Sequence, residues 1–67
     1  MNEYEEQLTI ERIALSRYPE ATGVKEIQPV IMTDEKTDAW LVILTTAQEF
    51  EFPVTLVTAE DIRNDTQ

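Results

Sequence analysis

The chain has 67 residues and carries 14 Asp and Glu residues against 5 Lys and Arg residues, a formal net charge of −9 at pH 7. It contains no His and no Cys, which excludes disulfides and argues against zinc sites, iron–sulfur clusters and most nucleophilic catalysis. The acidic charge also argues against direct contact with nucleic acid or with an anionic membrane surface, because both repel it.

The length predicts one small domain spanning residues 1–67. Such a chain buries roughly 60% of the surface that its unfolded form exposes, so disulfides, metals or association usually add stability. Because disulfides are excluded and metals disfavoured, the sequence favours a homodimer or a standing protein partner, although well-packed domains of this size also fold alone. The chain has no bilayer-spanning apolar run, no basic leader and no Cys, so we expect a cytoplasmic protein with no membrane contact.

The first predicted element is a helix from Asn2 to Tyr18. Asn2 suits the N-cap position, and Glu5 three residues later completes a capping-box-like pattern. Pro19 disfavours helical geometry at the residue before it and therefore predicts the end of the helix at Tyr18.

This helix carries a wide apolar arc with one carboxylate inside it. On one side of the arc lie Tyr4, Leu8, Leu15 and Tyr18, with Glu11 among them, and beside them come Ile10, Ala14 and, further round, Ile13. Two interpretations stay open, since a carboxylate is seldom buried without a partner. Either this side is a hydrated rim, or its four apolar side chains form an exposed contact surface while Ile10, Ile13 and Ala14 face a sheet.

Residues 20–23 read as a connector in which Gly23, the only glycine, is the best candidate for a positive φ. A strand is predicted from Val24 to Thr33, and Pro29 places it at a sheet edge because proline lacks a backbone donor. The following segment, Asp34 to Asp38, is a polar turn. It lacks the ligand spacing and the glycine of a calcium loop and has Lys36 at its centre, so we expect no metal there.

The strongest strand prediction covers Ala39 to Thr46, because Trp40 to Leu44 is an uninterrupted apolar run. Such a run predicts a central strand that is covered on both faces. The pattern then predicts a turn at Thr46–Gln48 and a third strand from Glu49 to Thr58.

In the third predicted strand, side chains alternate between the two faces. One face holds Phe50, Phe52, Val54 and Leu56. Pro53 favours an edge position for this strand. A short helical turn follows at residues 58–63, with Thr58 as its N-cap and Asp61 three residues later.

These elements predict an α+β fold of order α-β-β-β. An N-terminal amphipathic helix packs on a three-stranded antiparallel β-meander, and a short C-terminal helical turn follows. The short connections between the strands favour hairpins.

The carboxylates are open to two interpretations. They are either a hydrated surface that keeps the protein soluble, or an acidic face that imitates nucleic-acid phosphates and occupies a basic groove on another protein. The carboxylates fall into four groups along the chain: Glu3, Glu5, Glu6 and Glu11 on the helix; Asp34, Glu35 and Asp38 in the first turn; Glu49 and Glu51 on the third strand; and Glu60, Asp61 and Asp65 near the C-terminus.

Other chemistry has little support in the sequence. Glu49 and Glu51 share a face of the predicted strand and would allow acid–base catalysis, but no nucleophile or cofactor motif accompanies them. Trp40, Phe50 and Phe52 are expected in the core rather than in a stacking platform. We therefore expect no catalytic residue, no cofactor and no metal.

The leading functional hypothesis is a non-enzymatic protein-interaction module that binds a basic protein, in its narrowest form an inhibitor of a nucleic-acid-handling protein acting by DNA or RNA mimicry. The alternative is a structural homo-oligomer whose interface is the helix arc or a strand edge and whose charge serves solubility. The predicted protein-binding residues are Tyr4, Leu8, Glu11, Leu15, Tyr18, Asp34, Glu35, Asp38, Glu49 and Glu51.

Overall fold

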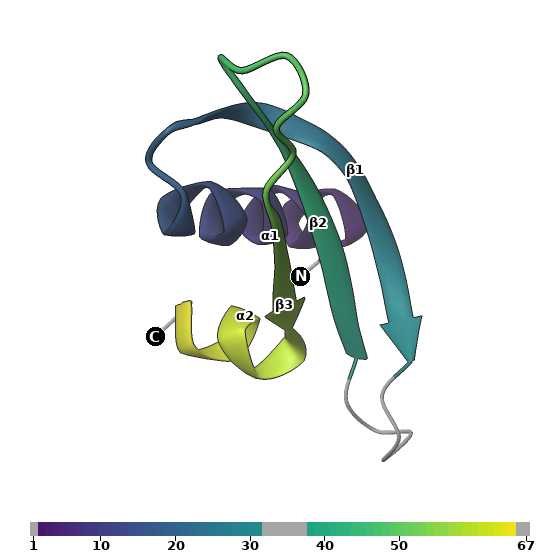
Figure 1. The fold of residues 1–67 in the computed structure, drawn as a ribbon. Helices are drawn as coiled ribbons and strands as arrows, with labels where there is room; N and C mark the ends of the chain where they lie inside the picture. The colour runs from purple at the N-terminus through teal and green to yellow at the C-terminus, as the bar shows by residue number, and fades with distance from the viewer. Residues whose placement is uncertain (1, 32–37, 66–67) are drawn as a thin grey trace.

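A computed structural model of the chain describes residues 2–31 and 38–65. Its elements in chain order are α1 (Glu3–Arg17), β1 (Ala21–Ile31), β2 (Asp38–Thr46), β3 (Val54–Thr58) and α2 (Ala59–Asp65). The strands form one antiparallel sheet of order β1-β2-β3, and α1 runs across one face of it (Figure 1). The predicted α+β fold, a helix followed by a β-meander, is confirmed.

Helix α1 begins and ends where its sequence signals predict. The Asn2 side chain accepts a hydrogen bond from the backbone N–H of Glu5 at 2.8 Å, which satisfies one of the free donors at the helix start. Pro19 then lies in a tight turn, in which the carbonyl of Tyr18 accepts from the N–H of Ala21 at 2.9 Å. Because this turn is complete at Ala21, the chain enters β1 three residues earlier than the pattern predicts.

Gly23 is therefore not in a connector, and its φ lies outside the left-handed region. It sits in β1 opposite Thr45, beside one of two irregularities in the β1–β2 register. A Cβ added at Gly23 would lie 3.4 Å from Thr45 Oγ1, which is an ordinary van der Waals distance, so this contact does not require a glycine. The prediction of a positive φ at this residue is wrong.

The core lies between α1 and the sheet. Ile10, Ile13 and Ala14 of α1 are buried, as the second interpretation of the helix arc requires. They pack in one cluster with alternate residues of the strands and with one residue of α2: Val42 and Leu44 of β2, Val57 of β3 and Ile62 of α2. Burial at every second strand position is the expected signature of a sheet with one face on the core.

Strand β2 is central, as predicted, but α1 covers only one of its faces. Val42 and Leu44 have no exposed surface, whereas Leu41 and Ile43, which point the other way, are half-buried. No other described element lies over that second face, which is the near face of the sheet in Figure 1. The expectation of cover on both sides is thus not met within residues 2–31 and 38–65.

Strand β3 is shorter than the predicted span from Glu49 to Thr58, because residues 47–53 form an irregular connector. The Thr46 hydroxyl organises this connector by accepting a hydrogen bond from the N–H of Gln48 at 3.0 Å. Pro53 cannot donate to a strand ladder, although its carbonyl accepts from the N–H of Leu44 at 2.8 Å. Regular pairing therefore starts only at Val54, which pairs with Ile43.

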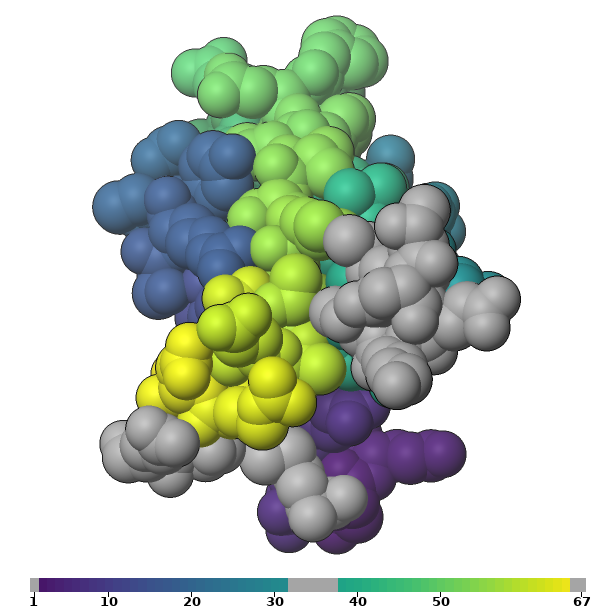
Figure 2. Space-filling model, turned by 90° about the horizontal axis from the view of Figure 1, so that it is seen from below, coloured from purple at the N-terminus to yellow at the C-terminus, as the bar shows by residue number. Residues whose placement is uncertain are grey.

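The predicted C-terminal helical turn is helix α2. It starts with a reciprocal capping box in which Thr58 Oγ1 accepts from the N–H of Asp61 at 3.2 Å, and Asp61 Oδ2 accepts from the N–H of Thr58 at 2.9 Å. Figure 2 shows α2 packed at one end of the molecule, next to β3. No helix in the described part of the chain is long and apolar enough to cross a membrane.

Replacement of Leu44 by Ala should lower the free energy of unfolding by about 2 to 5 kcal/mol, because it leaves a cavity in a fully buried part of this small core. Urea unfolding followed by circular dichroism measures the change. The matched control is Leu8→Ala, since Leu8 is 47% exposed and its truncation should change stability by about 0.5 kcal/mol or less. Equal effects of the two substitutions would contradict the location of the core.

Candidate functional site

A groove of about 580 Å³ lies between α1 and β1. Its floor is apolar and consists of Ile10, Val24, Ile27, Pro29 and Trp40. Trp40 is half-buried and packs against the core, so its ring is held by the fold. The groove therefore offers apolar surface that no described element covers.

The polar residues of the groove are mostly carboxylates. They come from one side of α1 and from the adjoining part of β1: Glu3, Glu6, Gln7, Glu11, Lys25 and Glu26. On α1 these residues recur three and four positions apart around the buried Ile10, which is the spacing of one helix face. The packing of Ile10 on the sheet thus fixes the glutamates at the rim.

This rim was partly visible in the sequence. Glu11 was assigned to the side of the arc that holds Tyr4 and Leu8, but the structure places it in the groove with Glu3 and Glu6. Glu3 and Glu6 were not among the predicted protein-binding residues. Glu3, Glu6 and Glu11 lie on the same helix face as Ile10. This spacing would have grouped them in the sequence if Ile10 had been known to face β1.

The predicted apolar contact surface on α1 is divided in two. Tyr4 and Leu8 are exposed, at 71% and 47%. Leu15 and Tyr18 are half-buried and pack against the core, and the Tyr18 hydroxyl donates to the carbonyl of Val54 at 3.3 Å. The division arises because the end of α1 that carries Leu15 and Tyr18 lies beside β3, whereas Tyr4 and Leu8 face solvent.

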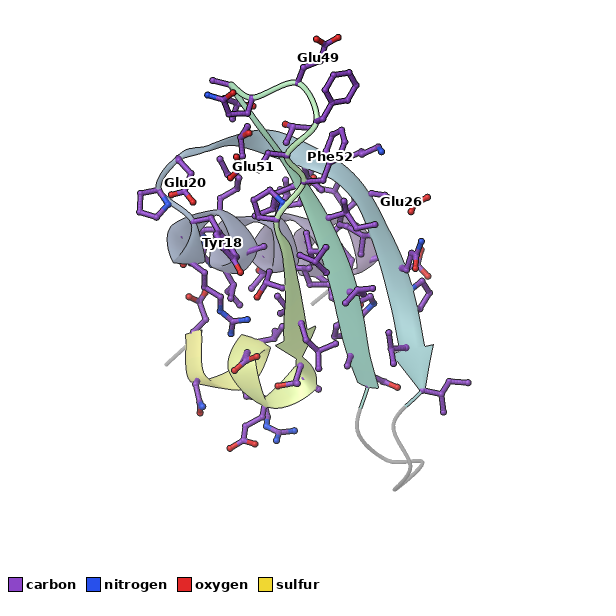
Figure 3. All side chains as sticks on the ribbon, in the orientation of Figure 1. Tyr18, Glu20, Glu26, Glu49, Glu51 and Phe52 are labelled. Atoms are coloured by element: carbon purple, nitrogen blue, oxygen red, sulfur yellow. The ribbon has the colours of Figure 1, made fainter. Side chains whose placement is uncertain are left out.

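The predicted acidic contact residues do not lie together. Asp34 and Glu35 fall outside the described residues. Asp38 is exposed at the first position of β2, and Glu49 and Glu51 are exposed in the connector beyond its last position, at the upper end of the molecule in Figure 3. A strand of this length spans roughly 30 Å, so Asp38 is far from the other two. Glu49 and Glu51 also leave the strand face on which they were predicted.

The connector instead exposes aromatic side chains. Phe50 is 88% exposed and Phe52 is 40% exposed, so the prediction that both belong to the core is wrong. The ammonium group of Lys25 lies 4.1 Å from the centroid of the Phe52 ring, within cation–π range. In the predicted strand both rings share a face with Val54 and Leu56, and that face lies opposite α1, so neither ring lies under the helix.

Two further carboxylates are engaged within the fold. Asp61 of α2 pairs with Arg17 at 3.1 Å, and Asp65 of α2 pairs with Arg12 through two side-chain hydrogen bonds. Arg17 also donates to the carbonyl of Leu56 at 2.6 Å. These contacts tie α2 and β3 to α1, so Asp61 and Asp65 are already paired with basic side chains.

The pairing shifts the titration of these groups. The pKa of Asp61 is lowered, chiefly by the hydrogen bond from the Thr58 N–H and also by Arg17. The hydrogen bond and charge of Arg12 lower the pKa of Asp65, and Asp65 in turn raises the pKa of Arg12. The ionised carboxylates therefore favour the folded state.

Among residues 2–31 and 38–65, no group of three or more Asp or Glu side chains is arranged to hold a metal ion. In the groove an apolar surface and several carboxylates meet. No protein-family model, no curated protein and no solved structure matches this chain.

The free energy of unfolding should fall in acid, because protonation of Asp61 removes its charged contacts. Its folded pKa lies below the ordinary value of 3.8, so its contribution is complete above about pH 4 to 5 and is lost as the pH falls through the folded pKa. At pH 7, Asp61→Asn should lower the free energy of unfolding by about 1 kcal/mol, the value of a charged hydrogen bond reduced by partial exposure.

Urea unfolding at several pH values between about 7 and about 2 measures both effects. The Asp61→Asn variant should lose less stability on acidification than the unmodified protein. Glu60→Gln, a charge change on the same short helix, is the control and should keep the original acid dependence. An unchanged acid dependence in Asp61→Asn would contradict the assignment.

Proposed function

We propose that this protein is a non-enzymatic interaction module that binds a basic segment of another protein. The groove between α1 and β1 carries the proposal, since its apolar floor is bordered by Glu3, Glu6, Glu11 and Glu26. Lys and Arg side chains combine an apolar stem with a cationic head. A segment with these residues next to an apolar anchor matches both the floor and the rim.

The net charge of −9 supports the same partner class. An acidic surface attracts a basic protein and raises its encounter rate, and it disfavours nucleic acid and other acidic proteins. Because Asp61 and Asp65 are paired within the fold, we assign the specific contact to the carboxylates of the groove and only the long-range attraction to the remaining charges.

Inhibition of a nucleic-acid-handling protein is the narrower form of this proposal. A surface that holds phosphates presents Arg and Lys side chains, and the glutamates along one side of α1 would pair with such side chains. Since Asp38 lies far from Glu49 and Glu51, we propose that any mimicry acts through the groove and not through a continuous acidic stripe.

The test uses a labelled synthetic peptide with Arg and Leu at helical spacing and measures binding by fluorescence anisotropy. The double variant Glu6→Gln/Glu11→Gln should bind about tenfold or more weakly, since close charge pairs at interfaces contribute strongly. The matched control, Glu49→Gln/Glu60→Gln, removes the same charge away from the groove. It should bind within about threefold of the unmodified protein, as expected for charges at a distance.

Affinity for the peptide should also fall steeply as salt rises from about 0.05 M to about 0.5 M, because screening weakens attraction between surface charges. Equal weakening by the two double variants would show that binding follows net charge and not the groove. Salt-independent binding would count against a basic partner.

Displacement of duplex DNA from a basic DNA-binding domain by this protein would support the narrower form, which is inhibition by mimicry. Failure to displace the DNA would oppose that form alone.

A further inference from the structure

The face of the sheet opposite α1 is apolar along β2 and β3, and no described element covers it. Along β1 the same face carries Glu26 and Gln28, which pair in register with Ile43 and Leu41. Register pairs Leu41 with Leu56 and Ile43 with Val54, so these four side chains stand together on that face. Val54 is 45% exposed and Leu56 is 38% exposed. Phe52, 40% exposed, borders the same surface from the connector, at the upper end of the sheet in Figure 3. We call these five residues the bare sheet face.

The sequence of β2 is that of a strand buried on both sides. Its run from Trp40 to Leu44 places apolar residues on the α1 side and on the bare sheet face alike. Strands with one hydrated face alternate between apolar and polar residues instead. The composition of β2 therefore fits a third layer on the bare sheet face.

We propose that this third layer is a second copy of the chain, packed sheet against sheet about a two-fold axis. Each bare sheet face would cover the other, and the two α1 helices would lie outermost. Face-to-face packing of twisted antiparallel sheets about 10 Å apart is a common protein architecture. A two-fold contact also needs only one surface that is complementary to itself.

The edges of the sheet do not offer an alternative contact between copies. Along β3, side chains of α1 occupy two backbone carbonyls: Tyr18 donates to Val54 and Arg17 donates to Leu56. Along β1, Pro29 and two register irregularities interrupt the ladder. Pairing of two copies through an edge strand is thus disfavoured at both β1 and β3. Packing of the two sheet faces is the contact that is left.

Charge repulsion does not oppose this contact strongly. The glutamates of α1 lie on the other side of the sheet, so the two helices of a dimer would be roughly 30 Å apart, well beyond the Debye length of about 8 Å at physiological salt. At the border of the bare sheet face, Lys25 and Glu26 are adjacent and opposite in charge. A two-fold axis allows such residues to pair reciprocally between copies.

The size of the contact suits a weak dimer. Over the length of β2, the three strands give a face of roughly 30 Å by 14 Å, to which the side chains and the connector add area. A standard interface removes roughly 800 Å² from each partner, which is about one sixth of the 4894 Å² surface of the chain. The dimer should therefore lie at the lower end of specific interfaces and dissociate on dilution.

Sedimentation equilibrium at several concentrations tests the proposal on the full chain without any partner. Leu56→Lys should weaken dimerisation about tenfold or more, because it places a charge at the centre of the contact. The same change also lowers the net negative charge, which by itself would favour association. The matched control is Leu8→Lys on the exposed side of α1, and it should leave the dimer intact.

A monomer at every concentration, including high salt where repulsion is screened, would overturn the proposal. So would a dimer that survives Leu56→Lys, or one that Leu8→Lys dissociates equally. Far-UV circular dichroism shows whether each variant is folded, and Phe52→Ser, which lies outside the strands, tests the same face if Leu56→Lys does not fold. Salt should leave the dimer unchanged or strengthen it, which separates this contact from the groove's attraction to a basic peptide.

Discussion

The packing of α1 across the sheet is the contact on which the rest of this structure depends. Ile10, Ile13 and Ala14 meet Val42 and Leu44 in a core that has few other members. Because a chain of this length has so little apolar surface to bury, α1 supplies most of the second layer, to which α2 adds Ile62. The position of α1 decides which side chains form the floor of the groove, which form its rim and which are exposed elsewhere.

The two ends of α1 have different roles as a result. At its C-terminal end, Arg17 and Tyr18 bind the backbone of β3, and Arg17 also binds Asp61 of α2. At its N-terminal half, Glu3 and Glu6 border the groove against β1. Arg17 at the C-terminal end of α1 thus binds residues of β3 and α2. The carboxylates of the N-terminal half border the open groove between α1 and β1.

The two surfaces proposed for binding differ in physical character. The groove combines an apolar floor with carboxylates and suits a basic segment, whereas the bare sheet face is almost wholly apolar and suits a copy of itself. They lie on the two sides of the sheet and meet at the β1 edge, where Lys25 and Glu26 line the groove and border the bare sheet face. A dimer through the bare sheet face would carry two grooves, and a partner with two basic segments would then bind with higher avidity.

The sequence by itself determined the elements and their order. Capping at Asn2 and Thr58, the stop at Pro19 and the apolar run of β2 are local signals, and each acts through backbone geometry within a few residues. Only the tertiary structure decided which carboxylates meet and which apolar residues stay exposed, since α1 covers one face of β2 and not the other. Phe50 and Phe52 fit a strand pattern, yet Pro53 ended the regular pairing. Glu11 joined the groove because the packing of Ile10 set the rotation of the helix, and that rotation depends on residues distant in sequence.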